Sequence, residues 1–217
     1  MKMKDIAIFG AGGFGKEVAC LINRINEETH QWTFIGFFDD NATIKNQMIS
    51  HFGKCLGTID DLNAYDKDLC VAIAIGNPKV TRMIVEKIIN PLISFPNLIH
   101  PTAKCTDEKT FIIGKGNIVQ GGCAFSCDVK IGDFNVLNGS IVFGHDDKIG
   151  SFNTFMPAVR ISGEVTMENE NFFGVGSIVL QQIKIGNGIR LGAGSVLMTK
   201  PKDGELYIGN PAKRMRF

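Results

Sequence analysis

An apolar residue recurs at every sixth position through the second half of this chain. These positions, which we call the anchors, are Ile113, Val119, Phe125, Ile131, Leu137, Phe143, Ile149, Phe155, Ile161, Met167, Phe173, Val179, Ile185, Leu191 and Leu197. A period of six matches neither the turn of an α-helix nor the two-residue alternation of a strand. It predicts a left-handed parallel β-helix, in which each hexapeptide forms one short strand and one turn, and three hexapeptides complete a coil.

The phase of the anchors predicts how far the β-helix extends. It is unbroken over residues 113–200, which corresponds to about five coils without a large insertion. Glycine, at 25 of 217 residues, and asparagine supply the turns that need tolerant backbone angles. Before Ile113 the phase slips by two residues at Ile99, Cys105 and Phe111. We therefore expect a poorly formed first coil near residues 99–112.

The first half of the chain follows other periods. Short apolar runs predict about four strands, at residues 5–9, 33–38, 69–75 and 92–95. A helix between the first two has an apolar face formed by Val18, Leu21, Ile22 and Ile25. Asn77 and Pro78 suit the N-cap and first residue of a second helix. This alternation predicts an α/β domain with a small Rossmann-like parallel sheet at residues 1–96, followed by the all-β domain at residues 97–217.

A glycine-rich loop links the first strand to the first helix. Its glycines are Gly10, Gly12, Gly13 and Gly15. Bare N–H groups at the positive end of a helix suit a phosphate or pyrophosphate. Asp39 and Asp40 end the next strand, where a carboxylate can bind a ribose or base. About four strands form only one mononucleotide-binding half, so a single nucleotide-linked ligand fits better than NAD. A purely structural turn is the alternative.

His145 is the one histidine within the regular repeats. An imidazole has the proton affinity of a general base near neutral pH, and Asp146 beside it can hold its tautomer. An exposed turn histidine without a role is the alternative. A zinc site on such a prism needs three histidines, so we expect no metal. The six cysteines are scattered without a C-x-x-C pair, which argues against zinc and a disulfide framework.

Charge and hydropathy limit the classes of partner that this protein can bind. The net charge is +1, which creates no strong field for nucleic acid or an anionic membrane. No apolar run approaches the roughly 18 residues of a membrane span, and the N-terminal residues lack the pattern of a signal peptide. We therefore expect a cytoplasmic protein that binds neither nucleic acid nor a membrane.

Five segments together resemble the bacterial hexapeptide-repeat sugar acyltransferases, the group of sialic-acid O-acetyltransferases and UDP-4-amino-sugar N-acetyltransferases. The segments are residues 10–15 (GAGGFG), 38–40 (FDD), 74–77 (AIGN), 144–146 (GHD) and 208–213 (IGNPAK). The hexapeptides alone indicate only an acyltransferase-like β-helix, whereas the combination is more specific and covers essentially the whole chain. Phe14 and Thr154 depart from the pattern, because members of the group often have histidine there.

The resemblance implies a homotrimer, with acyl-CoA between adjacent β-helices and a nucleotide sugar on the N-terminal domain. It implies that His145 is the general base, that Asp146 orients it, and that the N–H of Gly163 contacts the thioester carbonyl. The substrate contacts that it implies are Gly10, Gly12, Gly13, Gly15, Asp39, Asp40, Gly76, Asn77 and Asn138. The cofactor contacts are Thr154, Gly163, Gly209, Pro211 and Lys213.

The function predicted on this basis is direct transfer of an acetyl group, without a covalent enzyme intermediate. Acetyl-CoA would be the donor, and the amino group of a nucleotide-linked sugar would be the acceptor. A sugar O-acetyltransferase of the sialic-acid type and a non-catalytic scaffold that binds nucleotide sugars are the alternatives. The short N-terminal domain argues against a stand-alone NAD-linked enzyme.

Overall fold

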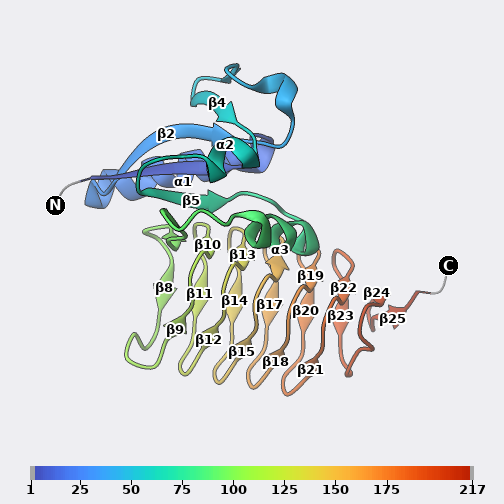
Figure 1. Ribbon diagram of the computed structural model, residues 1–217. Coiled ribbons are helices and arrows are strands. Elements are labelled where there is room, and N and C mark those ends of the chain that lie inside the picture. The colour runs from blue at the N-terminus through green and yellow to red at the C-terminus, as the bar shows by residue number, and fades with distance from the viewer. Residues whose placement is uncertain (1–2, 216–217) are drawn as a thin grey trace.

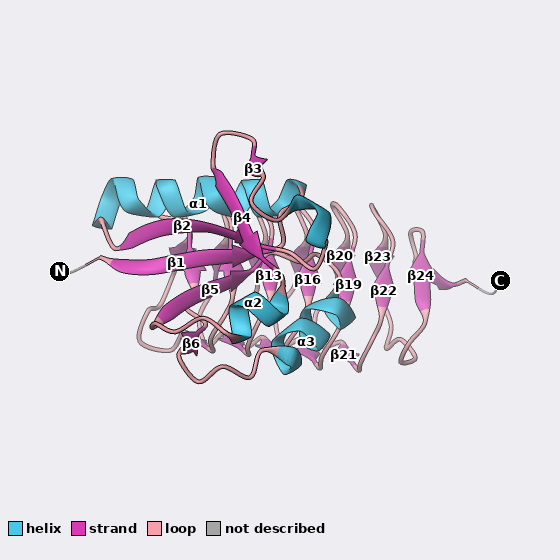
Figure 2. Cartoon of the chain, turned by 45° about the horizontal axis from the view of Figure 1, so that its top comes forward, coloured by secondary structure: helices cyan, strands magenta, loops and turns pink. Residues whose placement is uncertain are grey.

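The N-terminal part of the chain is a mostly parallel sheet with helices on both faces (Figure 2). The computed structural model describes residues 3–215. In the order β3-β4-β2-β1-β5-β6, the strands are β1 (Lys4–Phe9), β2 (Trp32–Phe38), β3 (Met48–Ile49), β4 (Gly53–Gly57), β5 (Leu69–Ile73) and β6 (Ile93–Ser94). The helices are α1 (Gly13–Thr29), a 3-10 turn η1 (Ala42–Ile44), α2 (Ile59–Asn63) and α3 (Pro78–Lys87).

Successive side chains of β1 point to opposite faces of this sheet, as the two-residue period of a strand requires. Ile6 and Ile8 pack with the apolar face of α1, whose four predicted residues are each at most 4% exposed. Ala7 and Phe9 point the other way and share a core with residues of α2 and α3. The four predicted strands and both predicted helices are therefore present.

Four elements of the N-terminal domain had no counterpart in the sequence prediction. They are η1, β3, β4 and α2. The strand β4 has a glycine at each end and a lysine after the first glycine, so its apolar run is very short, and pairing with β2 and β3 makes it a strand. The helix α2 has five residues and begins where the N–H of Thr58 donates to Asp61 Oδ2 at 2.8 Å. The sheet consequently has six strands instead of about four.

The C-terminal part is the predicted left-handed parallel β-helix, a three-sided prism of short strands (Figure 1). Face one contains β7 (Leu98–Ile99), β10 (Ile118–Val119), β13 (Val136–Leu137), β16 (Thr154–Phe155), β19 (Phe172–Phe173), β22 (Arg190–Leu191), β24 (Leu206–Ile208) and β25 (Lys213–Arg214). Face two contains β8 (Lys104–Cys105), β11 (Ala124–Phe125), β14 (Val142–Phe143), β17 (Arg160–Ile161), β20 (Ile178–Val179) and β23 (Val196–Leu197). Face three contains β9 (Ile112–Ile113), β12 (Lys130–Ile131), β15 (Lys148–Ile149), β18 (Thr166–Met167) and β21 (Lys184–Ile185).

The core of the prism consists of the anchors. Every anchor from Val119 to Leu197 is at most 4% exposed, and Ile113 is half-buried against them. Successive coils bring identical positions together, so that the rings of Phe155 and Phe173 stack with centroids 5.0 Å apart. Such stacking adds to the burial of each ring. The six-residue period of the anchors therefore indicates one continuous core.

Buried asparagines line the edge where face three meets face one. This asparagine ladder consists of Asn117, Asn135, Asn153 and Asn171, each at most 1% exposed. The side-chain oxygen of Asn117 accepts the N–H of Asn135 at 2.8 Å, and its Nδ2 donates to the carbonyl of Gly132 at 2.9 Å. Each rung thus satisfies one N–H and one carbonyl of neighbouring turns, as buried backbone groups require.

The first coil is complete, which corrects the expectation that it is poorly formed. Its strands β7, β8 and β9 pair with β10, β11 and β12. Cys105 pairs with Phe125 and is 20 residues from it, whereas Ile113 pairs with Ile131 at the regular spacing of 18. The two extra residues therefore lie in the turn between β8 and β9. The side chain of Asp107 braces this turn by accepting from the N–H of Lys109 and the hydroxyl of Thr110.

The N-terminal domain covers face one near the start of the prism. Leu98 and Ile118 point outward from that face and pack into the core beside α1, with 0% and 1% of their surface exposed. The ring of Phe134 contacts that of Phe95 at 5.1 Å, edge to face. These contacts bury outward-facing residues of face one against the N-terminal domain. Every helix within residues 3–215 is too short or too polar to cross a membrane.

We expect Phe155→Ala to lower the free energy of unfolding by about 3–5 kcal/mol, because the ring is fully buried and leaves a cavity between two coils. Urea denaturation followed by circular dichroism measures the change. Ile112→Ala is the matched control, since that side chain is 56% exposed and should change stability by about 0.5 kcal/mol or less. Equal losses in the two variants would contradict the proposed core.

Candidate active site

His145 lies on the edge where face two meets face three, in the turn after β14. Its Nδ1 is 2.8 Å from Oδ2 of Asp146, and the two side chains are 60% and 58% exposed. Asp146 adopts a left-handed backbone conformation, with φ of 61°, which turns the chain there. A carboxylate can only accept, so Nδ1–H donates to Asp146 in the neutral imidazole. The lone pair of Nε2 is then left for a substrate proton.

The electrostatic setting favours proton uptake by this imidazole. The hydrogen bond to Asp146 raises the pKa of His145 above its ordinary value, and the negative charges of Asp146 and Glu164 add to it, although partial desolvation opposes the shift. The raised pKa makes this imidazole a stronger base near neutral pH. The arrangement is that of a base with an orienting carboxylate.

Gly163 lies directly against the ring of His145, one coil further along the prism. A Cβ atom added at Gly163 would stand 2.7 Å from Nε2 of His145. Only glycine leaves room for the imidazole at this position. The N–H of Gly163 has no hydrogen-bond acceptor within the described part of the chain. The predicted base and the predicted oxyanion donor are therefore neighbours in the structure.

Asn138 lies on a different edge, where face one meets face two. Its Nδ2 donates to the carbonyl of Phe155 at 3.0 Å. It lines an open cavity of about 350 Å³ together with Gln120, Gly139 and Pro157 of the prism and with Glu17 and Cys20 of α1. The width of face two separates this edge from His145, because β14 connects them. One chain does not bring Asn138 and His145 to the same side.

The glycine-rich loop contains two glycines that the fold needs. Gly10 has φ of 110°, and a Cβ there would lie 2.7 Å from the carbonyl of Ala74. A Cβ on Gly15 would lie 2.0 Å from the carbonyl of Gly10. Gly12 and Gly13 differ, because no atom lies within 4 Å of a Cβ added to either. Those two positions leave their backbone open at the start of α1.

Asp39 and Asp40 hold the neighbouring backbone. Asp39 Oδ2 accepts the N–H of Ala11 at 2.8 Å, and Oδ1 accepts the N–H of Asn41 at 2.9 Å. Asp40 Oδ1 accepts the N–H of Ile59 at a longer 3.4 Å. Asp39 therefore ties the glycine-rich loop to the end of β2. This role in the fold accounts for the residue without a ligand, and the carboxylate retains lone pairs for one.

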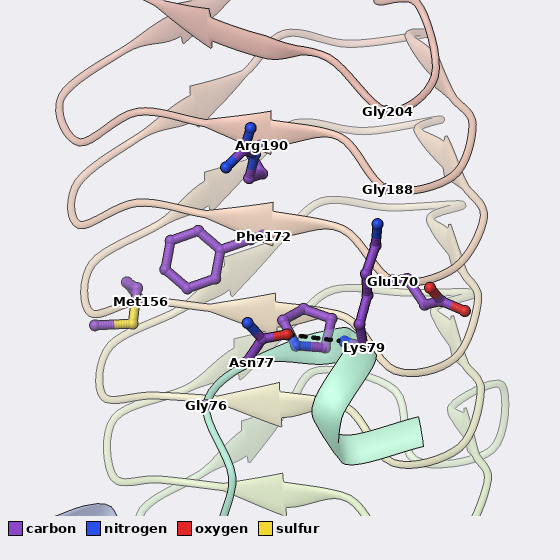
Figure 3. A pocket seen from close by; sticks show the side chains of 10 residues that line it. Gly76, Asn77, Lys79, Met156, Glu170, Phe172, Gly188, Arg190 and Gly204 are labelled. Carbon is purple, nitrogen blue, oxygen red and sulfur yellow. Dashed lines mark hydrogen bonds between the residues drawn. The ribbon is translucent and has the colours of Figure 1, made fainter. Parts of the chain in front are cut away.

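Gly76 and Asn77 line a cavity of about 690 Å³ between the start of α3 and face one (Figure 3). The side-chain oxygen of Asn77 is occupied as the cap of α3, since it accepts the N–H of Lys79 at 3.1 Å and that of Val80 at 3.3 Å. Sequence analysis missed the remaining lining residues, which are Pro78, Lys79, Met156, Glu170, Phe172, Gly188, Arg190 and Gly204.

Position within the hexapeptide could have identified two of these. Phe172 and Arg190 directly precede the anchors Phe173 and Leu191, so they must point out of the prism. Whether an outward residue meets solvent or the N-terminal domain depends on tertiary packing. The opening beside α3 leaves Phe172 half-buried and Arg190 exposed.

Thr154 differs from the other expected cofactor contacts in its burial. It points outward from β16 on face one and is only 1% exposed, so its side chain is closed to a ligand. Its neighbours in the prediction are open. Pro211 and Lys213 are exposed in the final hairpin, and Gly209 is half-buried, where its N–H donates to Ser195 Oγ at 2.9 Å.

Cysteines and potential metal ligands are dispersed through residues 3–215. No three His, Cys, Asp or Glu side chains of this region gather in a metal-binding arrangement. All six cysteines are free thiols. Burial raises the pKa of Cys123 to about 11, so this thiol is a poor source of a nucleophilic thiolate.

Sequence comparison connects the N-terminal domain with a known family. Residues 5–88 match the PglD N-terminal domain. The UDP-N-acetylbacillosamine N-acetyltransferase of Bacillus subtilis is 28% identical over 117 residues, which are 54% of this chain and 51% of that enzyme. The chain therefore matches about half the length of this curated relative.

Solved structures match over the full length. PerB from Caulobacter crescentus, in complex with CoA and GDP-perosamine, has a TM-score of 0.86 at 26% identity, and the match covers 99% of each chain. The acetyltransferase domain of PglB from Neisseria gonorrhoeae has a TM-score of 0.80 at 28% identity, over 98% of this chain and 100% of that one. The match to the PglD N-terminal domain and the full-length likeness to PerB and PglB confirm the resemblance of this chain to the bacterial hexapeptide-repeat sugar acyltransferases.

Proposed function

We propose that this protein transfers an acetyl group from acetyl-CoA to the amino group of a nucleotide-linked amino sugar, with His145 as general base. The observation that carries the proposal is the exposed His145–Asp146 pair with Gly163 against its ring. An imidazole whose Nδ1 is held by a carboxylate, next to a backbone N–H without an acceptor, is suited to acyl transfer.

The chemistry needs only one step at the carbonyl carbon. The acceptor amine attacks the thioester while Nε2 of His145 takes its proton, and the charge that develops on the carbonyl oxygen faces the N–H of Gly163. The C–N bond forms, the C–S bond breaks, and the departing thiolate of CoA receives a proton from the imidazolium. No covalent intermediate is required.

Two features support a nucleotide sugar as the acceptor. Gly12 and Gly13 leave bare backbone at the N-terminal end of α1, where a phosphate is stabilised. The same helix contributes Glu17 to the cavity that Asn138 lines, so a sugar attached to that phosphate would extend toward the prism. PerB is a relative solved with a nucleotide-linked amino sugar, and the B. subtilis relative is an N-acetyltransferase, which favours an amine over a hydroxyl as acceptor.

The donor site would run from Gly163 on the His145 edge to the last hairpin, whose strands β24 and β25 belong to face one. Coils of the prism are spaced by roughly 4.8 Å, the separation of neighbouring strands. Gly163 and the hairpin that holds Gly209, Pro211 and Lys213 are therefore separated by several coils. A long thioester such as acetyl-CoA could span this length, with the exposed ammonium of Lys213 near its charged end. PerB with CoA and the PglB domain with acetyl coenzyme A support this choice of donor.

The proposed site requires a second copy of the chain. Asn138 and His145 occupy different edges of one prism, and a small acceptor cannot contact both across the width of a face. A closed homotrimer would place the Asn138 edge of one copy against the His145 edge of the next. Each of three equivalent sites would then combine a nucleotide-binding domain and Asn138 from one subunit with the base from its neighbour.

We expect His145→Ala to lower kcat by about 10²–10⁴-fold, the usual contribution of a general base, while CoA still binds. Release of the CoA thiol, measured against a panel of UDP-, GDP- and CMP-linked amino and hydroxy sugars, reports the rate. Mass spectrometry of the product distinguishes amide from ester. His51→Ala is the matched control, because that exposed histidine lies in the β3–β4 hairpin away from the prism. Activity of His145→Ala close to that of the unmodified protein would reject the mechanism.

The pH profile of kcat/KM should rise as His145 loses its proton and level off above its pKa. The hydrogen bond that His145 donates to Asp146 is the largest cause that raises this pKa. Asp146→Asn removes the charge and should move the inflection to lower pH. The same displacement should be visible in the imidazole resonances of His145 in an NMR titration without substrate. An inflection that stays in place would show that a different group is being titrated.

Co-expression tests the shared site. His145→Ala and Asn138→Ala chains with different tags should each form inactive homotrimers, whereas mixed trimers purified through both tags should recover activity, because some sites then combine both unmodified residues. Light scattering gives the mass of the assembly. Mixed trimers as inactive as both parents would place the two residues in the same subunit's site and overturn the arrangement.

A further inference from the structure

A buried carboxyl group lies directly beneath the His145–Asp146 pair. Asp147 follows Asp146 in the turn, and its side chain is 0% exposed. The equivalent positions in the turns of neighbouring coils are aliphatic, namely Val129, Val165 and Ile183. Asp147 is therefore an acid in a position that the fold otherwise fills with hydrocarbon. Among the described residues, Oδ2 of Asp147 is one of four buried side-chain polar atoms without a hydrogen-bond partner.

The asparagine ladder explains what this atom faces. Each asparagine follows a residue with positive φ, as Asn135 follows Phe134 (φ 54°) and Asp147 follows Asp146 (φ 61°). An asparagine oxygen accepts the N–H found 18 residues further along, and Asp147 Oδ1 does the same from Val165 at 2.9 Å. The asparagine Nδ2 donates to the carbonyl found 15 residues further along, for example from Asn135 to Gly150. For Asp147 the corresponding carbonyl belongs to Ser162 (147 + 15).

We propose that Asp147 is a neutral carboxylic acid that donates its Oδ2 proton to the carbonyl of Ser162 and so positions the N–H of Gly163. A carboxylate has no donor, and two oxygen atoms facing each other in a buried site would repel. A protonated carboxyl has one donor and one acceptor oxygen, which reproduces an asparagine rung. Oδ2 of Asp147 thereby gains the carbonyl of Ser162 as its hydrogen-bond acceptor.

The surroundings favour the neutral form. Burial raises the pKa of Asp147 to about 7, and the charge of Asp146 acts in the same direction, while His145 and the N–H groups of Val165 and Gly144 oppose it. The titratable groups in the equivalent turns on either side, Asp128 and Glu164, are exposed to solvent. A second hydrogen bond, made only by the protonated form, raises the pKa further.

The effect on chemistry passes through one peptide unit. The carbonyl of Ser162 and the N–H of Gly163 belong to the same planar group, so a hydrogen bond to the oxygen orients the N–H. It also polarises that N–H, as linked hydrogen bonds do. Without it, the peptide next to a flexible glycine has no side chain to hold it. Asp147 is therefore a positioning residue that acts through Gly163.

Two substitutions separate this role from a structural one, given the transferase activity proposed above. Asp147→Asn restores the ladder rung with a permanent donor and should keep kcat within about threefold. Asp147→Val copies the neighbouring positions, so it should fold, keep KM for the acceptor and lose about tenfold or more in kcat, part of the loss seen when an oxyanion donor is removed. Equal loss in both variants, or unmodified kcat in Asp147→Val, would overturn the proposal.

A measurement without substrate keeps this test independent of the activity. The folded state should retain the proton of Asp147 while the unfolded chain loses it near pH 4. The measured quantity is the melting temperature of the unmodified protein minus that of Asp147→Asn at the same pH. This difference should fall as the pH rises from 4 to 7. A constant difference would show that Asp147 is ionised throughout and would refute its neutral form. The expected fall in a protein without transferase activity would refute the proposed function alone.

Discussion

Parallel pairing at a spacing of 18 residues is the constraint on which this structure depends. Each two-residue strand hydrogen-bonds to its equivalents in the coils before and after it. Each residue therefore lies against the residues at the equivalent positions of the neighbouring coils. Inward positions form one apolar core, and each edge of the prism becomes a column of turns. Residues 18 apart are thus neighbours, which is how His145 and Gly163 come to lie against each other.

The same stacking explains why one edge can carry chemistry without destabilising the prism. Turn residues contribute little to the apolar core, so His145 and Asp146 are free to be polar and exposed. Asp147 is the exception, since it takes a buried aliphatic position immediately below them. A buried acid that lowers the stability of the fold is a feature expected at a functional site. The asparagine ladder on another edge shows how the fold satisfies such a group when it can donate.

Sequence periodicity predicted the prism well because burial alternates with strict regularity in a β-helix. The glycine-rich loop and the first helix were predicted for a related reason, since backbone geometry and an apolar face leave local marks. The strand β4 and the first coil were not predicted, because β4 exists by pairing with β2 and β3, and the two-residue slip after Cys105 is absorbed in a braced turn. The burial of Thr154 could not be predicted either, because an outward position in the hexapeptide does not indicate what covers it.

The amino-acid sequence by itself determined the six-residue repeat, the succession of an α/β part and a β-helix, and the presence of one histidine–aspartate pair in the turns. Tertiary structure alone decided that Asp39 braces the glycine-rich loop, that Gly163 touches the imidazole, and that Asn138 and His145 lie on different edges. The physical reason is that periodicity records whether a side chain faces inward or outward. Which outward groups meet depends on how coils and domains pack, and that is set by contacts between distant residues.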